Sequence, residues 1–201
     1  MKQDVPNGKL VVLNGASSAG KTTVAEALRP LFGSSCVLTG FDEILDRTLP
    51  FGPESRSGLD RLRRSARIAA FQLTNGRMRL FLALHREVSA LVREGHDVVV
   101  DTALMERGIL LDAARCFAPL DGLFVGMKPP LAVSQRWEAA RTDRPRGQAR
   151  RHYDAIHAHG TYDLLLDPST MLPQECAQAI MQRLEAGPPP KAFRQVLTGA
   201  R

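Results

Sequence analysis

The chain contains few cysteines, and it lacks any long apolar run. Only 3 of its 201 residues are Cys, and no two of them form a CxxC pair. This usage argues against a disulfide framework or a zinc site and favours a reducing compartment, so we expect a cytoplasmic protein. The sequence nowhere offers the roughly 18 consecutive apolar residues that a membrane helix needs, and its N-terminal apolar run is too short for a signal peptide.

Aromatic residues are also scarce, at 5%, while Lys and Arg outnumber Asp and Glu by 27 to 21. The positive net charge favours anionic ligands such as nucleotides, phosphates or nucleic acid. Nucleic acid is disfavoured among these because the basic stretches lack interleaved aromatic side chains. With 44% hydrophobic residues the chain has a globular composition, and its length suits one domain, which we place at residues 1–190.

Short apolar runs alternate with segments of helical period along the whole chain. The runs are LVVLN (10–14), CVLTG (36–40), DVVVD (97–101), GLFVG (122–126) and YDLLLD (162–167). They are continuous in Val and Leu instead of alternating with polar residues, which is typical of parallel strands buried on both faces. The sequence therefore predicts an α/β fold with a five-stranded parallel sheet and helices on both faces.

Helical periodicity predicts the connecting helices and also marks two exceptions. Helices are expected over 24–32, 41–49, 78–94, 106–117, 131–141, 148–158 and from about 174 to 186. The Arg-, Gly- and Pro-containing segment 51–76 is expected to be irregular or partly helical and to cover a ligand. GPPP at 187–190 ends the core, so the basic tail 191–201 is expected to be flexible.

The strongest motif is GASSAGKT, residues 15–22, which matches G-x-x-x-x-G-K-[ST] between a predicted strand and a predicted helix. In such a loop backbone N–H groups wrap phosphates, Lys21 reaches the β/γ-phosphates, and the Thr22 hydroxyl can ligate Mg²⁺. The alternative is a glycine-rich turn without a nucleotide. We predict an ATP or GTP site formed by Gly15, Ala16, Ser17, Ser18, Ala19, Gly20, Lys21, Thr22 and Thr23.

Two acids follow predicted strands at the edge of the sheet where the phosphate loop lies. Asp42 can accept a proton from a substrate hydroxyl that attacks the γ-phosphate, and we favour this role over the alternative that it only caps a helix beginning at Glu43. Asp101 ends the valine strand at the position of a Walker B acid, where with Thr22 it would hold Mg²⁺. Two alternatives remain for Asp101: it is an ordinary acid at the end of a strand, or it contacts the acceptor.

Six arginines lie between residues 136 and 151, around the break TDRPRG. Arginines beside a flexible break can close over a transferring phosphoryl group, which predicts a mobile lid at about 136–152 with Arg141 and Arg144 as catalytic residues. The alternative is that most of these six arginines only form a solvated basic face of a helix. The three histidines at 152, 157 and 159 lack carboxylates at ligand spacing, so we interpret them as surface or helix-face residues and not as metal ligands.

Taken together, the ordered blocks resemble the chloramphenicol phosphotransferase family, a branch of the small P-loop kinases. The blocks are VVLNGASSAGKTT, GFDEIL, LHREVSALVREGHDVVVD, LFVGMKPPLAVSQRWEAARTDRPRGQA, IHAHGTYDLLLD and QECAQAI. The resemblance implies transfer of the ATP γ-phosphoryl group to a hydroxyl of a small molecule, in the namesake an antibiotic that is thereby inactivated. By position it makes Asp42 the catalytic base, Lys21 the phosphate-loop lysine, and Arg141 and Arg144 lid arginines.

The resemblance departs at Thr102, where a member of the family carries a second acid, and over 51–76. We therefore retain two alternatives, a kinase of another metabolite or of a nucleic-acid hydroxyl, and a non-catalytic nucleotide-binding regulatory protein. The expected ligands are ATP, Mg²⁺ and a small-molecule alcohol. No membrane partner is expected, and a homo-oligomer is allowed.

Overall fold

The structure is a computed structural model that describes residues 6–33, 35–48, 76–141 and 147–199, without the side chains of 46 and 48. The expectations for 51–75 and for Arg144 lie outside these residues. The described part contains one parallel sheet, with strand order β2-β3-β1-β4-β5. Its strands are β1 (Leu10–Asn14), β2 (Val37–Gly40), β3 (Val98–Thr102), β4 (Leu123–Met127) and β5 (Leu164–Leu166). The predicted five-stranded parallel sheet is thus confirmed.

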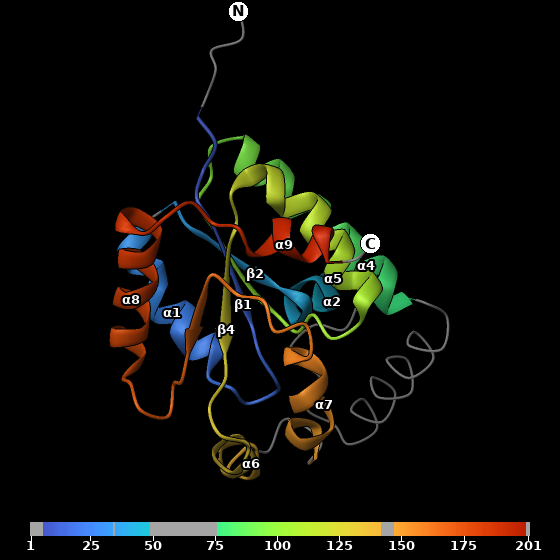
Figure 1. The fold of residues 1–201 in the computed structure, drawn as a ribbon, viewed down its shortest axis with the longest axis vertical. Coiled ribbons are helices and arrows are strands. Elements are labelled where there is room, and N and C mark those ends of the chain that lie inside the picture. Colours follow the sequence, from blue (N-terminus) through green and yellow to red (C-terminus); the bar gives the residue numbers. More distant parts are fainter. Residues whose placement is uncertain (1–5, 34, 49–75, 142–146, 200–201) are drawn as a thin grey trace, which may run out of the picture.

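Helices cover both faces of this sheet, also as predicted (Figure 1). The described helices are α1 (Lys21–Phe32), α2 (Phe41–Thr48), α4 (Gly76–Arg93), α5 (Arg107–Phe117), the 3-10 turn η1 (Ala118–Leu120), α6 (Leu131–Ala139), α7 (Gln148–His157), α8 (Pro173–Ala186) and α9 (Ala192–Thr198). α1 and α8 lie against one face, and α4, α5 and α9 against the other. α6 and α7 lie beyond the carboxyl ends of the strands (Figure 1).

The central strand explains why the apolar runs are continuous. Leu10 and Val12 of β1 pack into the cluster on the α4, α5 and α9 side, whereas Val11 and Leu13 pack into the cluster on the α1 and α8 side. Successive side chains of a strand point to opposite faces, and both faces here are covered, so each position must be apolar. Within the described ranges, no helix combines the length and the apolarity that crossing a membrane requires.

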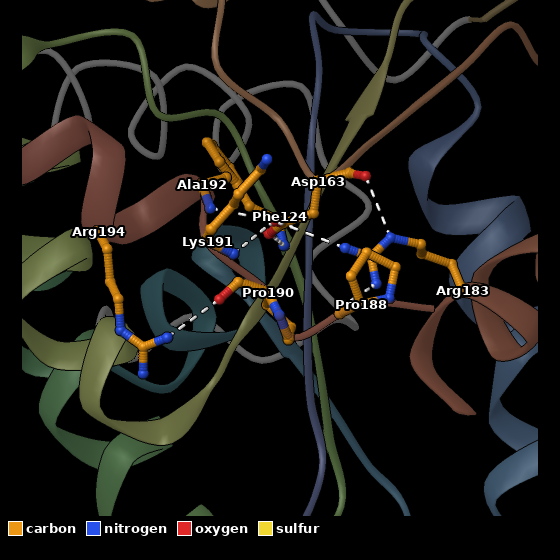
Figure 2. Close-up of polar contacts among 8 residues, drawn as sticks. All are labelled: Phe124, Asp163, Arg183, Pro188, Pro190, Lys191, Ala192 and Arg194. Atoms are coloured by element: carbon orange, nitrogen blue, oxygen red, sulfur yellow. Dashed lines mark hydrogen bonds and ion pairs between the residues drawn. The ribbon is translucent and has the colours of Figure 1, made fainter. Parts of the chain in front are cut away.

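The expectation of a flexible tail after residue 190 is wrong, because residues 192–198 form α9 (Figure 2). The Asp163 carboxylate accepts hydrogen bonds from the backbone N–H groups of Lys191 (2.7 Å), Ala192 (3.0 Å) and Phe124 (3.0 Å). Phe193 is buried, and its ring stacks on that of Phe124 with centroids 4.5 Å apart. A carboxylate at the helix N-terminus and a buried aromatic ring together hold this helix on the sheet.

Glu138 joins α6 to the beginning of α7. This α6 side chain is buried, and its two carboxylate oxygens accept hydrogen bonds from the backbone N–H groups of Gly147 and Ala149, each at 2.8 Å. The contact satisfies donors at the start of α7 that have no partner within the helix. α6 and the beginning of α7 are therefore joined through one carboxylate.

Candidate functional site

The turn between β1 and α1 has the backbone of an anion-binding loop. Ser18 and Gly20 have φ of 59° and 82°, in the left-handed region. A Cβ on Gly15 would lie 2.6 Å from the Met127 carbonyl oxygen, so only glycine fits there. The hydroxyl oxygens of Ser17 and Ser18 are buried and have no hydrogen-bond partner in the structure. Turns that include a left-handed residue can direct backbone N–H groups into one concavity, which suits a phosphate.

Lys21, the first residue of α1, is buried at the base of this loop. Its ammonium donates hydrogen bonds to the carbonyl oxygens of Gly15 (2.9 Å) and Ala16 (3.0 Å), and it lies 3.7 Å from Asp101 Oδ1. The positive charge is thus held between the loop and the end of β3. In this position it can pair with a phosphate that enters the loop.

Thr22 and Asp101 form the adjacent pair predicted for magnesium. The Thr22 hydroxyl donates a hydrogen bond of 2.6 Å to Asp101 Oδ2. β2 approaches closely at this point, since a Cβ on Gly40 would lie 2.4 Å from the Asp101 carbonyl oxygen. The described residues contain no group of three or more His, Cys, Asp or Glu side chains that could hold a metal ion. A hydroxyl and one carboxylate, completed by phosphate oxygens and water, are nevertheless a suitable set for Mg²⁺.

Asp42 lines the same cleft as Lys21 and Asp101, a cavity of about 280 Å³. α2 begins at Phe41, directly after β2, so Asp42 lies within the first helical turn and does not cap a helix beginning at Glu43. The carboxyl ends of neighbouring parallel strands meet at one edge of a sheet, and this brings β2, β1 and β3 residues together.

The remaining predicted residues are placed unevenly around the cleft. Residues 18–23 of the phosphate loop line it, whereas Gly15, Ala16 and Ser17 do not. Arg141, two residues beyond the end of α6, also lines it. The structure therefore brings together one of the two proposed lid arginines with Lys21, Asp42 and Asp101, while their chemical roles stay predictions.

The sequence analysis missed several side chains of the cleft. Phe41, Glu43, Arg77 and Phe81 line it in addition to the predicted residues. Burial raises the pKa of Glu43; Thr39 and the charge of Arg47 act in the opposite direction, and the charges of Asp101 and Glu26 raise it further. Glu43 adjoins Asp42 in the sequence, which was a usable signal. Arg77 follows an arginine-rich segment and so resembled one more surface charge.

Of the two alternatives for His157, a surface or a helix-face residue, the first is wrong, because His157 is the last residue of α7 and is buried. The Nδ1 atom of His157 lies 2.8 Å from the Tyr162 hydroxyl, which accepts a 2.9 Å hydrogen bond from the Asn14 side chain. Burial, with the charges of Lys128, His159 and Lys21 in support, lowers the pKa of His157 to about 4. Asn14 immediately precedes the phosphate loop, so this network connects the end of α7 to the loop.

Comparison with known proteins agrees with this geometry. The family model described as chloramphenicol phosphotransferase-like protein matches residues 8–185. The chain belongs to this family. A Mycobacterium tuberculosis protein provisionally named an O-phosphotransferase is 32% identical over 205 residues, which cover 96% of this chain and 89% of that protein.

Two solved kinases share the fold. The Mycobacterium tuberculosis APS kinase, solved with AMPPNP and APS, has a TM-score of 0.57 and 21% identity, and the match covers 90% of this chain and 99% of that one. The Acinetobacter baumannii shikimate kinase, solved with shikimate, has a TM-score of 0.57 and 14% identity, covering 91% and 95%. The family and the name of the 32% identical relative support a kinase-like O-phosphotransferase, and the two solved kinases show the shared fold.

Proposed function

We propose that this protein transfers the γ-phosphoryl group of ATP to a hydroxyl group of a small molecule. The observation that carries the proposal is the presence of Lys21, Asp42 and Asp101 on one cleft of about 280 Å³. A concave cleft that combines apolar walls with a few charged groups is typical of a small-molecule site. Phosphoryl transfer depends mainly on positioning and on charge, and this cleft supplies both kinds of group.

The phosphate loop fits a nucleotide and Mg²⁺. The Ser18 hydroxyl, which has no partner and belongs to a residue that lines the cleft, can donate to a phosphate oxygen, and Lys21 would hold a phosphate at the base of the loop. Thr22 and Asp101 would hold Mg²⁺ between them and the nucleotide. When bound, Mg²⁺ supplies neutralisation of the phosphate charge.

Asp42 would accept the proton of the acceptor hydroxyl. Its carboxylate lies in the first turn of α2 and lines the cleft that the phosphate loop also lines. An acceptor hydroxyl bound there would lie between this base and the phosphate to be transferred. Glu43 is the competing base, because burial raises its pKa toward the range in which a carboxyl group accepts protons efficiently at neutral pH. Arg141 would stabilise the transferring group from a lid at about 136–152.

A mass-spectrometric acceptor screen tests the reaction class. We expect one member of a panel of hydroxylated metabolites and antibiotics, chloramphenicol included, to gain the mass of one phosphate on incubation with Mg-ATP and the protein. An oligonucleotide arm tests the nucleic-acid alternative. Tight ATP binding without transfer to any alcohol would instead support the non-catalytic regulatory alternative.

The first prediction concerns the base. Asp42→Asn should lower acceptor-dependent ADP formation by about a hundredfold or more, since a positioned base contributes about that factor, and should leave ATP affinity unchanged. Steady-state kinetics and nucleotide titration measure the two quantities. The variant Glu43→Gln is the matched comparison. Loss of transfer in Glu43→Gln with full activity in Asp42→Asn would assign the base to Glu43.

A further inference from the structure

We propose that Arg77 makes this cleft selective for an alcohol that also carries an oxyanion, a carboxylate or a phosphate monoester. The inference rests on the proposed function, because it names the class of acceptor that the same cleft takes. Arg77 is the second residue of α4, and it lines the cleft together with Asp42 and Lys21. An acceptor would then meet a cation and the proposed base in one cavity.

Two aromatic rings fix the position of the Arg77 guanidinium. Its central carbon lies 5.7 Å from the centroid of the Phe41 ring and 5.6 Å from that of the Phe81 ring. These rings are themselves stacked, with centroids 4.5 Å apart. Cation–π contacts hold the planar group in place without using its hydrogen-bond donors. The guanidinium is therefore preorganised and keeps donors for a ligand.

The contacts of Arg77 leave that donor capacity largely unused. Its Nε is buried and has no hydrogen-bond partner, and the carboxylate of Glu106 lies 3.7 Å away, beyond hydrogen-bond distance. Within the part of the chain described, Glu106 supplies the only ion pair of Arg77, and 51% of the Glu106 side chain is exposed. A buried donor without a partner is costly, and an oxyanion can satisfy an arginine in a bidentate manner.

Charged groups of both signs lie around Arg77, because the cleft that it lines also carries Lys21 and four carboxylates, those of Glu26, Asp42, Glu43 and Asp101. Burial lowers the pKa of His152 on α7, and the charges of Arg77 and Arg151 lower it further, whereas Glu138 acts in the opposite direction. Arg141 lines the same cleft. A ligand oxyanion would pair with the Arg77 guanidinium, while the hydroxyl group of the same ligand would meet Asp42 in the same cleft.

Pairs of related alcohols, of which one carries an oxyanion and the other is neutral, test the inference. The pairs are shikimate and its carboxamide, glycerate and glyceramide, and glycerol 3-phosphate and glycerol, each with Mg-ATP in an ADP-release assay. We expect at least a tenfold higher kcat/KM for the anionic member of a pair. Arg77→Gln should abolish that preference by raising KM for the anion, whereas Arg79→Gln, an exposed arginine of the same helix, should retain it. The pair that is discriminated tells carboxylate from phosphate.

A binding measurement separates failure of the inference from failure of the proposed function. The ADP-loaded protein is titrated with the same pairs by calorimetry, and ADP affinity itself should not differ between wild type and Arg77→Gln. If the wild type binds the anion and Arg77→Gln weakens that binding at least tenfold, the inference is supported. This holds even if no acceptor is phosphorylated, because only the proposed transfer reaction then fails. Equal binding or turnover of charged and neutral members, or an equal loss for both in Arg77→Gln, overturns it.

Discussion

At the scale of single residues, burial controls the protonation of His157. The imidazole is neutral in the folded protein because its pKa is lowered from 6.5 to about 4. Below pH 6.5 the unfolded chain binds a proton that the folded chain does not, so folding stability rises with pH between about 4 and 6.5. The stabilising contribution is complete above that window and is lost as the pH falls through it.

His157→Gln should therefore flatten the pH dependence of stability. Between pH 8 and pH 5 the wild type should lose about 2 kcal/mol of its free energy of unfolding from this group, which the variant cannot lose. Urea unfolding at the two pH values measures the difference. His96→Gln, at an exposed histidine, is the control and should keep the wild-type slope. The same slope in all three proteins would contradict the burial of a neutral His157.

At the scale of elements, the C-terminal helix shows how a short segment is held by contacts with distant strands. α9 spans only Ala192–Thr198, too short to be stable alone. The Asp163 carboxylate fixes the N-terminus of α9 (Figure 2). The buried Phe193 ring, which contacts the rings of Phe117 and Phe124, fixes the position of this helix on the sheet. Its stability is therefore tertiary in origin.

Phe193→Ala should lower the free energy of unfolding by about 3 to 5 kcal/mol, because it removes a buried ring and leaves a cavity against the sheet. Equilibrium urea unfolding followed by circular dichroism measures this loss. Gln195→Ala, at an exposed position of the same helix, should change stability by less than about 0.5 kcal/mol. A small effect of Phe193→Ala would mean that α9 does not contribute to the core.

At the scale of the whole molecule, the cleft is assembled from segments that are far apart in the chain. Phosphate-loop residues, the starts of α2 and α4, the end of β3 and the residues after α6 all line it. Ligand binding should therefore stabilise the whole fold and not one element, since the parts that contact the ligand are joined through the sheet.

A non-hydrolysable ATP analogue with Mg²⁺, at about a hundred times its Kd, should stabilise the fold by about 2.7 kcal/mol. For a chain of this length the corresponding rise in Tm is about 5 to 10 °C, measured by differential scanning calorimetry. Lys21→Ala should show a much smaller rise at the same ligand concentration. An unchanged Tm of the wild type would contradict nucleotide binding in the cleft.

The features that depend on local chemistry could be predicted from the residues alone. Continuous apolar runs indicate strands covered on both faces, and GASSAGKT requires a particular turn before a helix, so the sheet and the phosphate loop were predictable. The position of Arg77 on the cleft, the burial of His157 and the packing of α9 on the sheet could be known only from the folded chain. These three outcomes depend on packing between segments distant in the chain, and such packing leaves no periodic pattern in the residues themselves.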